Sequence, residues 1–94
     1  MSAWKITEEG LQNSDGFTVQ FEDRTTARYI EGKRTLTIEL EYTNKNTVYV
    51  YLKEAAHWDA PNDTDLITPE GKKRIRQNLQ DAFLFERLQT KFDD

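Results

Sequence analysis

Two carboxylates that stand two residues apart are the first side chains that could do chemistry. Glu39 and Glu41 lie between Arg34 and Tyr42, where polar and apolar residues alternate, and such alternation predicts a half-buried strand. Both carboxylates therefore project from one face of that strand. They could serve as an acid and a base or bind a cation, but a solvated sheet face has the same pattern and is the simpler interpretation.

The residues that nucleophilic catalysis requires are absent or isolated. The sequence has no cysteine, and its serines, Ser2 and Ser14, lie near the terminus and in a turn-forming segment. The sole histidine, His57, has no evident partner, and a loop position beside Trp58 accounts for it. We therefore expect no catalytic residue, no cofactor and no thiolate metal site.

An acidic segment has part of the spacing of a calcium loop. Five residues fall at positions 1, 5, 7, 9 and 12 of a twelve-residue EF-hand loop: Asp59, Asp63, Asp65, Ile67 and Glu70. Pro61 stands at position 3, where a ligand is needed, and Thr64 at position 6, where glycine is needed. We interpret the segment as a polar connector whose carboxylates favour the start of a helix, and we expect no metal.

A basic cluster follows at Lys72, Lys73, Arg74 and Arg76. Such a cluster could contact phosphate, but on a helix it is typically a solvated face, and the sequence has no glycine-rich phosphate loop. The net charge of −4 opposes affinity for nucleic acid or anionic membranes. Because no apolar run is long enough to span a bilayer and residues 1–10 have no apolar signal segment, we expect a cytoplasmic protein.

The elements that position these residues are strands followed by a helix. Alternation predicts a short strand around Trp4 and Ile6 and further strands at residues 17–21, 27–30, 34–42 and 47–53. Residues 54–67 have no period and are expected to be a loop. The predicted core face of the sheet consists of alternate apolar residues: Phe17, Val19, Phe21, Leu36, Ile38, Leu40, Val48, Val50 and Leu52.

The helix has a clear start signal. Thr68 is a good N-cap, Pro69 suits the first helical position and Glu70 complements the helix dipole. We expect a helix from Pro69 to about Lys91 that covers the sheet with Ile75, Leu79 and Phe83. The sequence, 94 residues long, thus predicts a single α+β domain over residues 1–94: an antiparallel β-meander of four to five strands followed by one long C-terminal helix packed on one sheet face.

The second half of that helix has an apolar stripe of its own. On a straight helix, four residues gather roughly opposite the sheet-facing stripe: Leu84, Phe85, Leu88 and Phe92. One sheet cannot cover both stripes. We therefore expect these residues to form a contact surface, most simply in a homodimer; the alternatives are a bend in the helix or an N-terminal strand that folds over them through Trp4.

The outer sheet face carries the best candidate for partner binding. With a turn at residues 44–46, Glu41 lies opposite Tyr49 and Glu39 opposite Tyr51. Tyrosines on a flat solvated face are good protein-contact residues because they are large, rigid and amphipathic. The alternative is ordinary cross-strand packing that stabilises the sheet.

Several segments occur in a fixed order: Tyr29-Ile30-Glu31-Gly32-Lys33-Arg34, Leu36-Thr37-Ile38-Glu39, Val48-Tyr49-Val50-Tyr51-Leu52, Trp58-Asp59-Ala60-Pro61, and Ile67-Thr68-Pro69-Glu70 with Ile75. From residue 29 to residue 85 the chain resembles a family of small bacterial proteins, some of whose members are assigned as immunity proteins of polymorphic toxin systems. The resemblance implies a β-meander with a helix and a non-enzymatic binding role, and it supplies no catalytic residue.

Three functions remain open at this point. The leading hypothesis is a protein-binding module of the inhibitor or immunity type, in which the acidic face complements a basic partner. The second is single-stranded nucleic-acid binding through Tyr49, Tyr51 and the basic start of the helix, since four strands and a helix also resemble a single-stranded-DNA-binding coactivator fold; Glu39 and Glu41 oppose it. The third is a carboxylate enzyme that uses these two glutamates.

Overall fold

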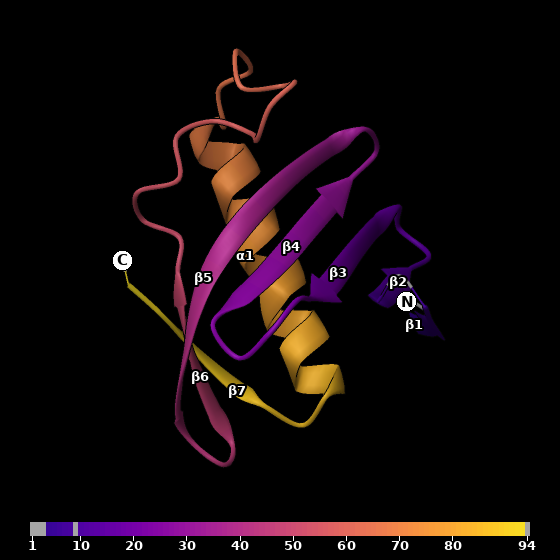
Figure 1. The fold of residues 1–94 in the computed structure, drawn as a ribbon, viewed down its shortest axis with the longest axis vertical. Coiled ribbons are helices and arrows are strands. Elements are labelled where there is room, and N and C mark those ends of the chain that lie inside the picture. Colours follow the sequence, from indigo (N-terminus) through magenta and orange to yellow (C-terminus); the bar gives the residue numbers. More distant parts are fainter. Residues whose placement is uncertain (1–3, 9, 94) are drawn as a thin grey trace.

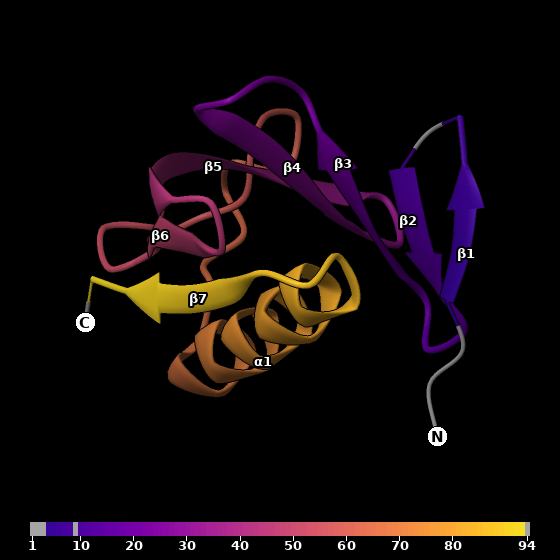
Figure 2. The same cartoon turned by 90° about the horizontal axis from the view of Figure 1, so that it is seen from below.

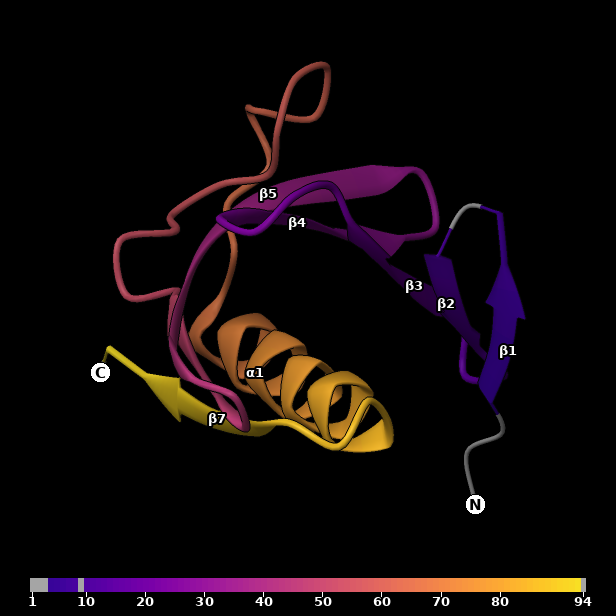
Figure 3. The same cartoon turned by 60° about the horizontal axis from the view of Figure 1, so that its bottom comes forward.

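The chain folds as one curved sheet that arches over a single helix. The computed structural model describes residues 4–8 and 10–93 (Figure 1). The seven strands follow one another in the sheet in chain order: β1 (Trp4–Thr7), β2 (Gly10–Asn13), β3 (Phe17–Phe21), β4 (Thr26–Glu31), β5 (Arg34–Asn44), β6 (Thr47–Tyr51) and β7 (Gln89–Phe92). The helix α1 (Pro69–Phe85) lies on the concave side of the sheet (Figures 2 and 3).

The α+β meander with a helix on one face is confirmed, but the expected number of strands is wrong. Strands β1 to β6 pair antiparallel with their sequence neighbours, whereas β7 pairs parallel with β6. The sheet has seven strands rather than four to five. The two strands that the sequence does not predict are β2 and β7. Parallel pairing of β7 is possible because α1 carries the chain back along the sheet before β7 begins.

The core lies between the concave face and α1, as the alternation predicts. Ile38 is 2% exposed and Val50 is fully buried, while Glu39 points to solvent. All of the predicted inward residues are buried except Phe21, which is half-buried and packs its ring on Phe83 with centroids 5.5 Å apart. Since a slip of one residue would expose every inward side chain, the predicted register is confirmed.

The helix begins where the sequence predicts. The Oγ1 atom of Thr68 accepts a hydrogen bond from the Gly71 amide at 3.0 Å, and Pro69 occupies the first turn. Ile75, Leu79 and Phe83 are fully buried against the sheet. The N-cap and the sheet-facing stripe are therefore both confirmed.

The helix ends six residues earlier than expected, at Phe85 instead of Lys91. Arg87 adopts a left-handed conformation with φ of 64°, and the amides of Arg87 and Leu88 donate to the carbonyls of Leu84 and Phe83 at 2.9 and 2.8 Å. These two bonds form a Schellman motif, which terminates a helix. The motif usually carries glycine at the left-handed position, so the arginine here hides the helix end in the sequence.

The early helix end changes the predicted apolar stripe. Leu88 and Phe92 leave the helix and pack as half-buried side chains against the core, while Leu84 is 62% and Phe85 45% exposed. The premise of one helical stripe is therefore wrong. Trp4 of β1 lies beside Phe85, with ring centroids 5.7 Å apart, so part of the predicted cover by the N-terminal strand is present.

Candidate functional site

The candidate site is the convex face of β5 and β6. Glu39 pairs with Tyr51 and Glu41 pairs with Tyr49, as predicted. The predicted turn at residues 44–46 is wrong: Asn44 pairs with Thr47, the turn consists of residues 45–46, and a shift between Tyr42 and Asn44 preserves the predicted pairing. Glu39, Glu41 and Tyr51 are exposed, and Tyr49 is half-buried. The structure thus brings together all four side chains that the sequence suggested for this face.

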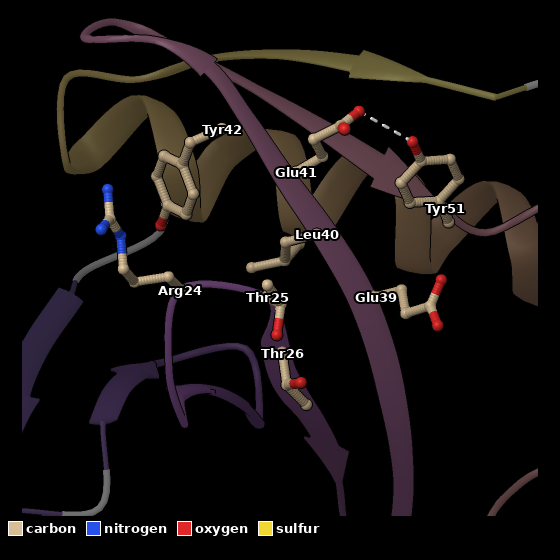
Figure 4. A pocket seen from close by; sticks show the side chains of 8 residues that line it. All are labelled: Arg24, Thr25, Thr26, Glu39, Leu40, Glu41, Tyr42 and Tyr51. Carbon is tan, nitrogen blue, oxygen red and sulfur yellow. Dashed lines mark hydrogen bonds between the residues drawn. The ribbon is translucent and has the colours of Figure 1, made fainter.

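The two tyrosines and Glu41 form a linked group. The rings of Tyr49 and Tyr51 lie 5.1 Å apart at an angle of 40°. The Tyr51 hydroxyl donates a hydrogen bond to Glu41 Oε2 at 3.0 Å, diagonally across the two strands (Figure 4). This hydrogen bond raises the pKa of Tyr51 above its ordinary value. The hydrogen bond to Glu41 and the contact with Tyr49 both favour this orientation of the Tyr51 ring.

Cations lie at the margins of this face. Lys91 of β7 pairs with Tyr49. Arg28 of β4 lies opposite Thr37 and forms an ion pair with Glu22 at 3.1 Å. The centre of the face is therefore acidic and aromatic, and its positive charges stand to either side.

A shallow hollow of about 590 Å³ borders the acidic centre. It is lined by Arg24, Thr25, Thr26, Glu39, Leu40, Glu41, Tyr42 and Tyr51. Figure 4 shows Glu39, Glu41 and Tyr51 on one side of β5 and Tyr42 with Arg24 on the other side. The guanidinium of Arg24 therefore does not neutralise the two carboxylates directly.

Three of the four side chains of the basic cluster make contacts within the chain. Lys72 donates to the Lys53 carbonyl at 2.8 Å, and Arg74 binds both oxygens of Glu31 at 3.0 and 2.7 Å. The guanidinium of Arg76 lies 4.8 Å from the ring centre of Phe92. These three side chains stabilise the packing of α1 and do not form a common phosphate-binding surface.

The acidic segment between β6 and α1 also makes internal contacts. Asp59 Oδ2 accepts hydrogen bonds from the Thr37 amide at 3.0 Å and from its hydroxyl at 2.6 Å. Asp65 forms an ion pair with Arg34 at 3.4 Å. Across residues 4–8 and 10–93, no group of three or more His, Asp or Glu side chains is placed to hold a metal ion.

A polar network at the inner end of β4 was not predicted. The Tyr29 hydroxyl donates to Glu31 Oε2 at 2.5 Å and accepts from Asn78 Nδ2 at 2.9 Å. Arg74 donates two further hydrogen bonds to the carboxylate of Glu31. Partial burial acts to raise the pKa of Glu31, but the hydrogen bonds from Arg74 and Tyr29 outweigh it and lower that pKa. Burial, with the bond to Glu31, raises the pKa of Tyr29. The only sequence signal was that Tyr29 stands at an inward position of its strand.

Comparison with known families gives one match. The model of the family described as Immunity protein 74 matches residues 23–93, which is most of the chain. The chain belongs to the Immunity protein 74 family. The match spans every element from β4 to β7, and the candidate face lies entirely within it. Membership indicates an inhibitor-type, protein-binding role and a protein partner.

The other comparisons add no relative of this immunity protein. No curated protein and no solved structure gives a significant match. In the described part of the chain, no helix has the length and apolar character needed to cross a membrane.

Proposed function

We propose that this immunity protein neutralises a toxin by binding it non-enzymatically through the convex face formed by Glu39, Glu41, Tyr49 and Tyr51. The observation that carries the proposal is the linked group of Glu41, Tyr49 and Tyr51. The exposed carboxylate of Glu39 lies beside this group, paired with Tyr51. The group lies inside the segment that the family model matches.

The chemistry of the face fits a basic partner. Two carboxylates at the centre of a patch attract a positively charged surface and reject a negative one, which contributes to association rate and specificity. The tyrosine rings supply apolar contact area with little loss of side-chain entropy. Since Tyr51 is already held by Glu41 at 3.0 Å, ordering that ring on binding costs less than ordering a free one.

Charge reversal on the face tests the proposal. We expect the double variant Glu39→Lys with Glu41→Lys to lose protection of cells that express the cognate toxin. The matched control is Glu54→Lys with Asp63→Lys, which makes the same charge change at two exposed loop residues and should protect as the wild type does. Equal protection by both double variants would refute the role of the face.

The same variants separate protein binding from nucleic-acid binding. Phosphate contacts weaken steeply as salt rises, and adding lysines strengthens them. If the face binds toxin, the lysine variant loses toxin and gains weak affinity for a fluorescent single-stranded oligonucleotide. Tight, salt-dependent oligonucleotide binding by the wild type would support the nucleic-acid alternative instead.

We further propose a second contact surface at the end of α1, where Leu84 and Phe85 are exposed. Of the other two residues of the predicted stripe, Leu88 is half-buried nearby, and Phe92 is half-buried with its ring beside Arg76 of the same helix. The most economical occupant of this surface is a second copy of the chain in a homodimer. Sedimentation equilibrium of the wild type and of Leu84→Glu tests this: we expect a dimer that the charge disrupts. A wild type that remains monomeric at high concentration would end the proposal.

A further inference from the structure

Strand β5 is longer than the strands on either side of it. About half of each of its edges is therefore not paired with a neighbouring strand. Its pairing with β4 covers residues 34–39, and its pairing with β6 covers residues 39–44. The first half of β5 therefore extends past β6, and the second half extends past β4. A free strand edge is a template for pairing with another chain, and proteins usually cover it.

The edge that extends past β6 is covered by the loop between β6 and α1. The Asp59 amide donates to the Thr35 carbonyl at 2.8 Å, and the Asp59 carboxylate accepts from the Thr37 amide at 3.0 Å. One loop residue thus takes the place of a neighbouring strand. The neighbouring Trp58 is buried in the core and anchors this cover.

The edge that extends past β4 has no such cover. The last bond of the β4–β5 ladder runs from the Leu40 amide to the Thr25 carbonyl at 2.8 Å. The Thr25 amide does not return a bond to Leu40, because it donates to Asp23 Oδ1 at 2.8 Å. The ladder therefore ends here, because the Asp23 carboxylate accepts the Thr25 amide that would otherwise bond to Leu40. Short polar side chains often form such local bonds in turns.

The groups left on this edge follow from strand geometry. In an antiparallel ladder the N–H and C=O of one residue point to the same side. Because the Leu40 amide faces β4, the Leu40 carbonyl and both backbone groups of Tyr42 face the same way. In the part of the chain that the structure describes, no strand pairs with these groups. A bulge between Tyr42 and Asn44 limits the open edge to this short stretch.

The space beside the open edge is hollow on both faces of the sheet. The convex hollow contains Glu39, Glu41 and Tyr51. The concave hollow, about 650 Å³ in volume, is lined by Phe21, Asp23, Arg24, Tyr42, Thr43, Asn44 and Lys45. Arg24 and Tyr42 border both hollows, so the two meet at the edge itself.

We propose that the open edge from Leu40 to Tyr42 receives a short extended segment of the toxin as an added strand. Side chains of a strand alternate between its two faces, so consecutive residues of that segment enter the convex and the concave hollow in turn. The carboxylates of Glu39 and Glu41 select a basic side chain on the convex side, and the rings of Phe21 and Tyr42 select an apolar one on the concave side. Main-chain bonds then supply affinity and the two hollows supply specificity. This inference rests on the proposed function and specifies how the same face holds its partner.

Amide hydrogen exchange in the isolated protein and in its complex with the toxin tests the added strand. The Tyr42 amide faces the open edge and should exchange rapidly in the free protein; in the complex its exchange should slow by about tenfold or more, because it gains a protein acceptor. The Thr37 amide is already bonded to Asp59 and serves as the internal control, with little change expected.

The outcomes separate this inference from the function on which it rests. If the complex forms and depends on Glu39 and Glu41, but the exchange of the Tyr42 amide is unchanged, the face binds toxin without an added strand and the inference is overturned. If no complex forms, the proposed function and the inference both fall. If the Tyr42 amide becomes protected in concentrated free protein that sediments as a dimer, the occupant of the edge is a second copy and the toxin segment is refuted.

Discussion

Two tyrosine–glutamate hydrogen bonds of the same chemical type lie on opposite faces of the sheet. On the concave face, the hydroxyl of fully buried Tyr29 donates to Glu31 at 2.5 Å. On the convex face, the hydroxyl of Tyr51, which is 40% exposed, donates to Glu41 at 3.0 Å. The inner pair, Tyr29 with Glu31, is placed to stabilise the fold, whereas the outer pair, Tyr51 with Glu41, is accessible to a partner.

The inner pair consists of a buried tyrosine and a partly buried glutamate, whose side chain is 26% exposed. The ring of Tyr29 stacks on Phe17 and Trp58 with centroid distances of 5.7 and 6.2 Å. Its hydroxyl also accepts a bond from Asn78, and Glu31 is held by Arg74. These bonds join β4 to α1 and satisfy groups that would be costly to bury unpaired. We therefore expect the inner pair to contribute to stability and not to binding.

The contacts of the outer pair lie on its own face of the sheet. Tyr51 touches the ring of Tyr49 and bonds to Glu41, and both partners remain open to solvent or to a second protein. An exposed hydrogen bond of this kind contributes little to stability because water competes for both groups. The two pairs have the same chemistry but different surroundings. We therefore expect the inner pair to contribute to stability and the outer pair to contribute to binding.

The largest expected effect is the loss of the ring that supports the inner pair. Trp58 is 2% exposed, stacks on Tyr29 and lies 5.7 Å from the guanidinium of Arg34. We expect Trp58→Ala to lower the free energy of unfolding by about 3–5 kcal/mol, the usual cost of truncating a buried tryptophan. Urea unfolding measures this value, and a loss below about 1 kcal/mol would show that the loop around Trp58 does not belong to the core.

Removing the inner hydroxyl should have the next largest effect. Tyr29→Phe keeps the ring but leaves Asn78 Nδ2 without its acceptor and Glu31 without one donor. We expect a loss of about 1–2 kcal/mol in the free energy of unfolding, because two partly buried polar groups each lose a hydrogen-bond partner. Toxin affinity, measured by calorimetric titration, should remain that of the wild type. Weakened binding with unchanged stability would reverse the assignment of the two pairs.

The inner pair should also make stability depend on pH at both extremes. The pKa of Glu31 is lowered in the folded protein, so its contribution is present above the unfolded value of about 4.3 and is lost as the pH falls through the folded pKa. The pKa of Tyr29 is raised, so its contribution is present below about pH 10 and is lost at higher pH. The stability difference between wild type and Glu31→Gln should therefore shrink in acid, and that between wild type and Tyr29→Phe should shrink in alkali. Differences that stay constant with pH would contradict the network.

The smallest effect on folding is expected for the outer hydroxyl. Tyr51→Phe removes the bond to Glu41 but keeps the exposed ring, so the melting temperature should stay close to that of the wild type. Toxin affinity should fall modestly, because the ring loses its fixed orientation and the interface loses a polar group. A large drop in melting temperature, comparable to that of Tyr29→Phe, would show that the outer pair is structural as well.

The sequence predicts the outer face better than the inner network, and for a physical reason. Alternation along β5 and β6 sets which side chains share a face, and the turn-forming residues between the two strands limit how they can pair. The placement of Glu41 opposite Tyr49 is therefore predicted, although the turn is one residue shorter than expected and a register shift between Tyr42 and Asn44 makes up the difference. The contact between Arg74 and Glu31 joins residues 43 positions apart. Such a contact depends on where α1 crosses the sheet, and no local pattern encodes it.

The missed strands have equally specific causes. The sequence predicts helix through most of strand β7 because the helix ends at Arg87, an arginine in the conformation for which glycine is the usual signal. Strand β2 is a segment of four residues whose first residue, Gly10, lies so close to β3 that a Cβ atom would stand 2.5 Å from the Val19 carbonyl oxygen. A glycine at the start of a short segment usually indicates a turn. Here the glycine instead permits two strands to approach each other closely.

The most direct test of the central claim is an NMR map of the amide resonances that shift when the toxin binds. Our account predicts that the largest shifts cluster on the convex face, around Glu39, Glu41, Tyr49 and Tyr51. It predicts little change around Asn78 and the inner network. A cluster centred on α1, with the amides of β5 and β6 unmoved, would contradict the claim that this immunity protein uses its acidic tyrosine face.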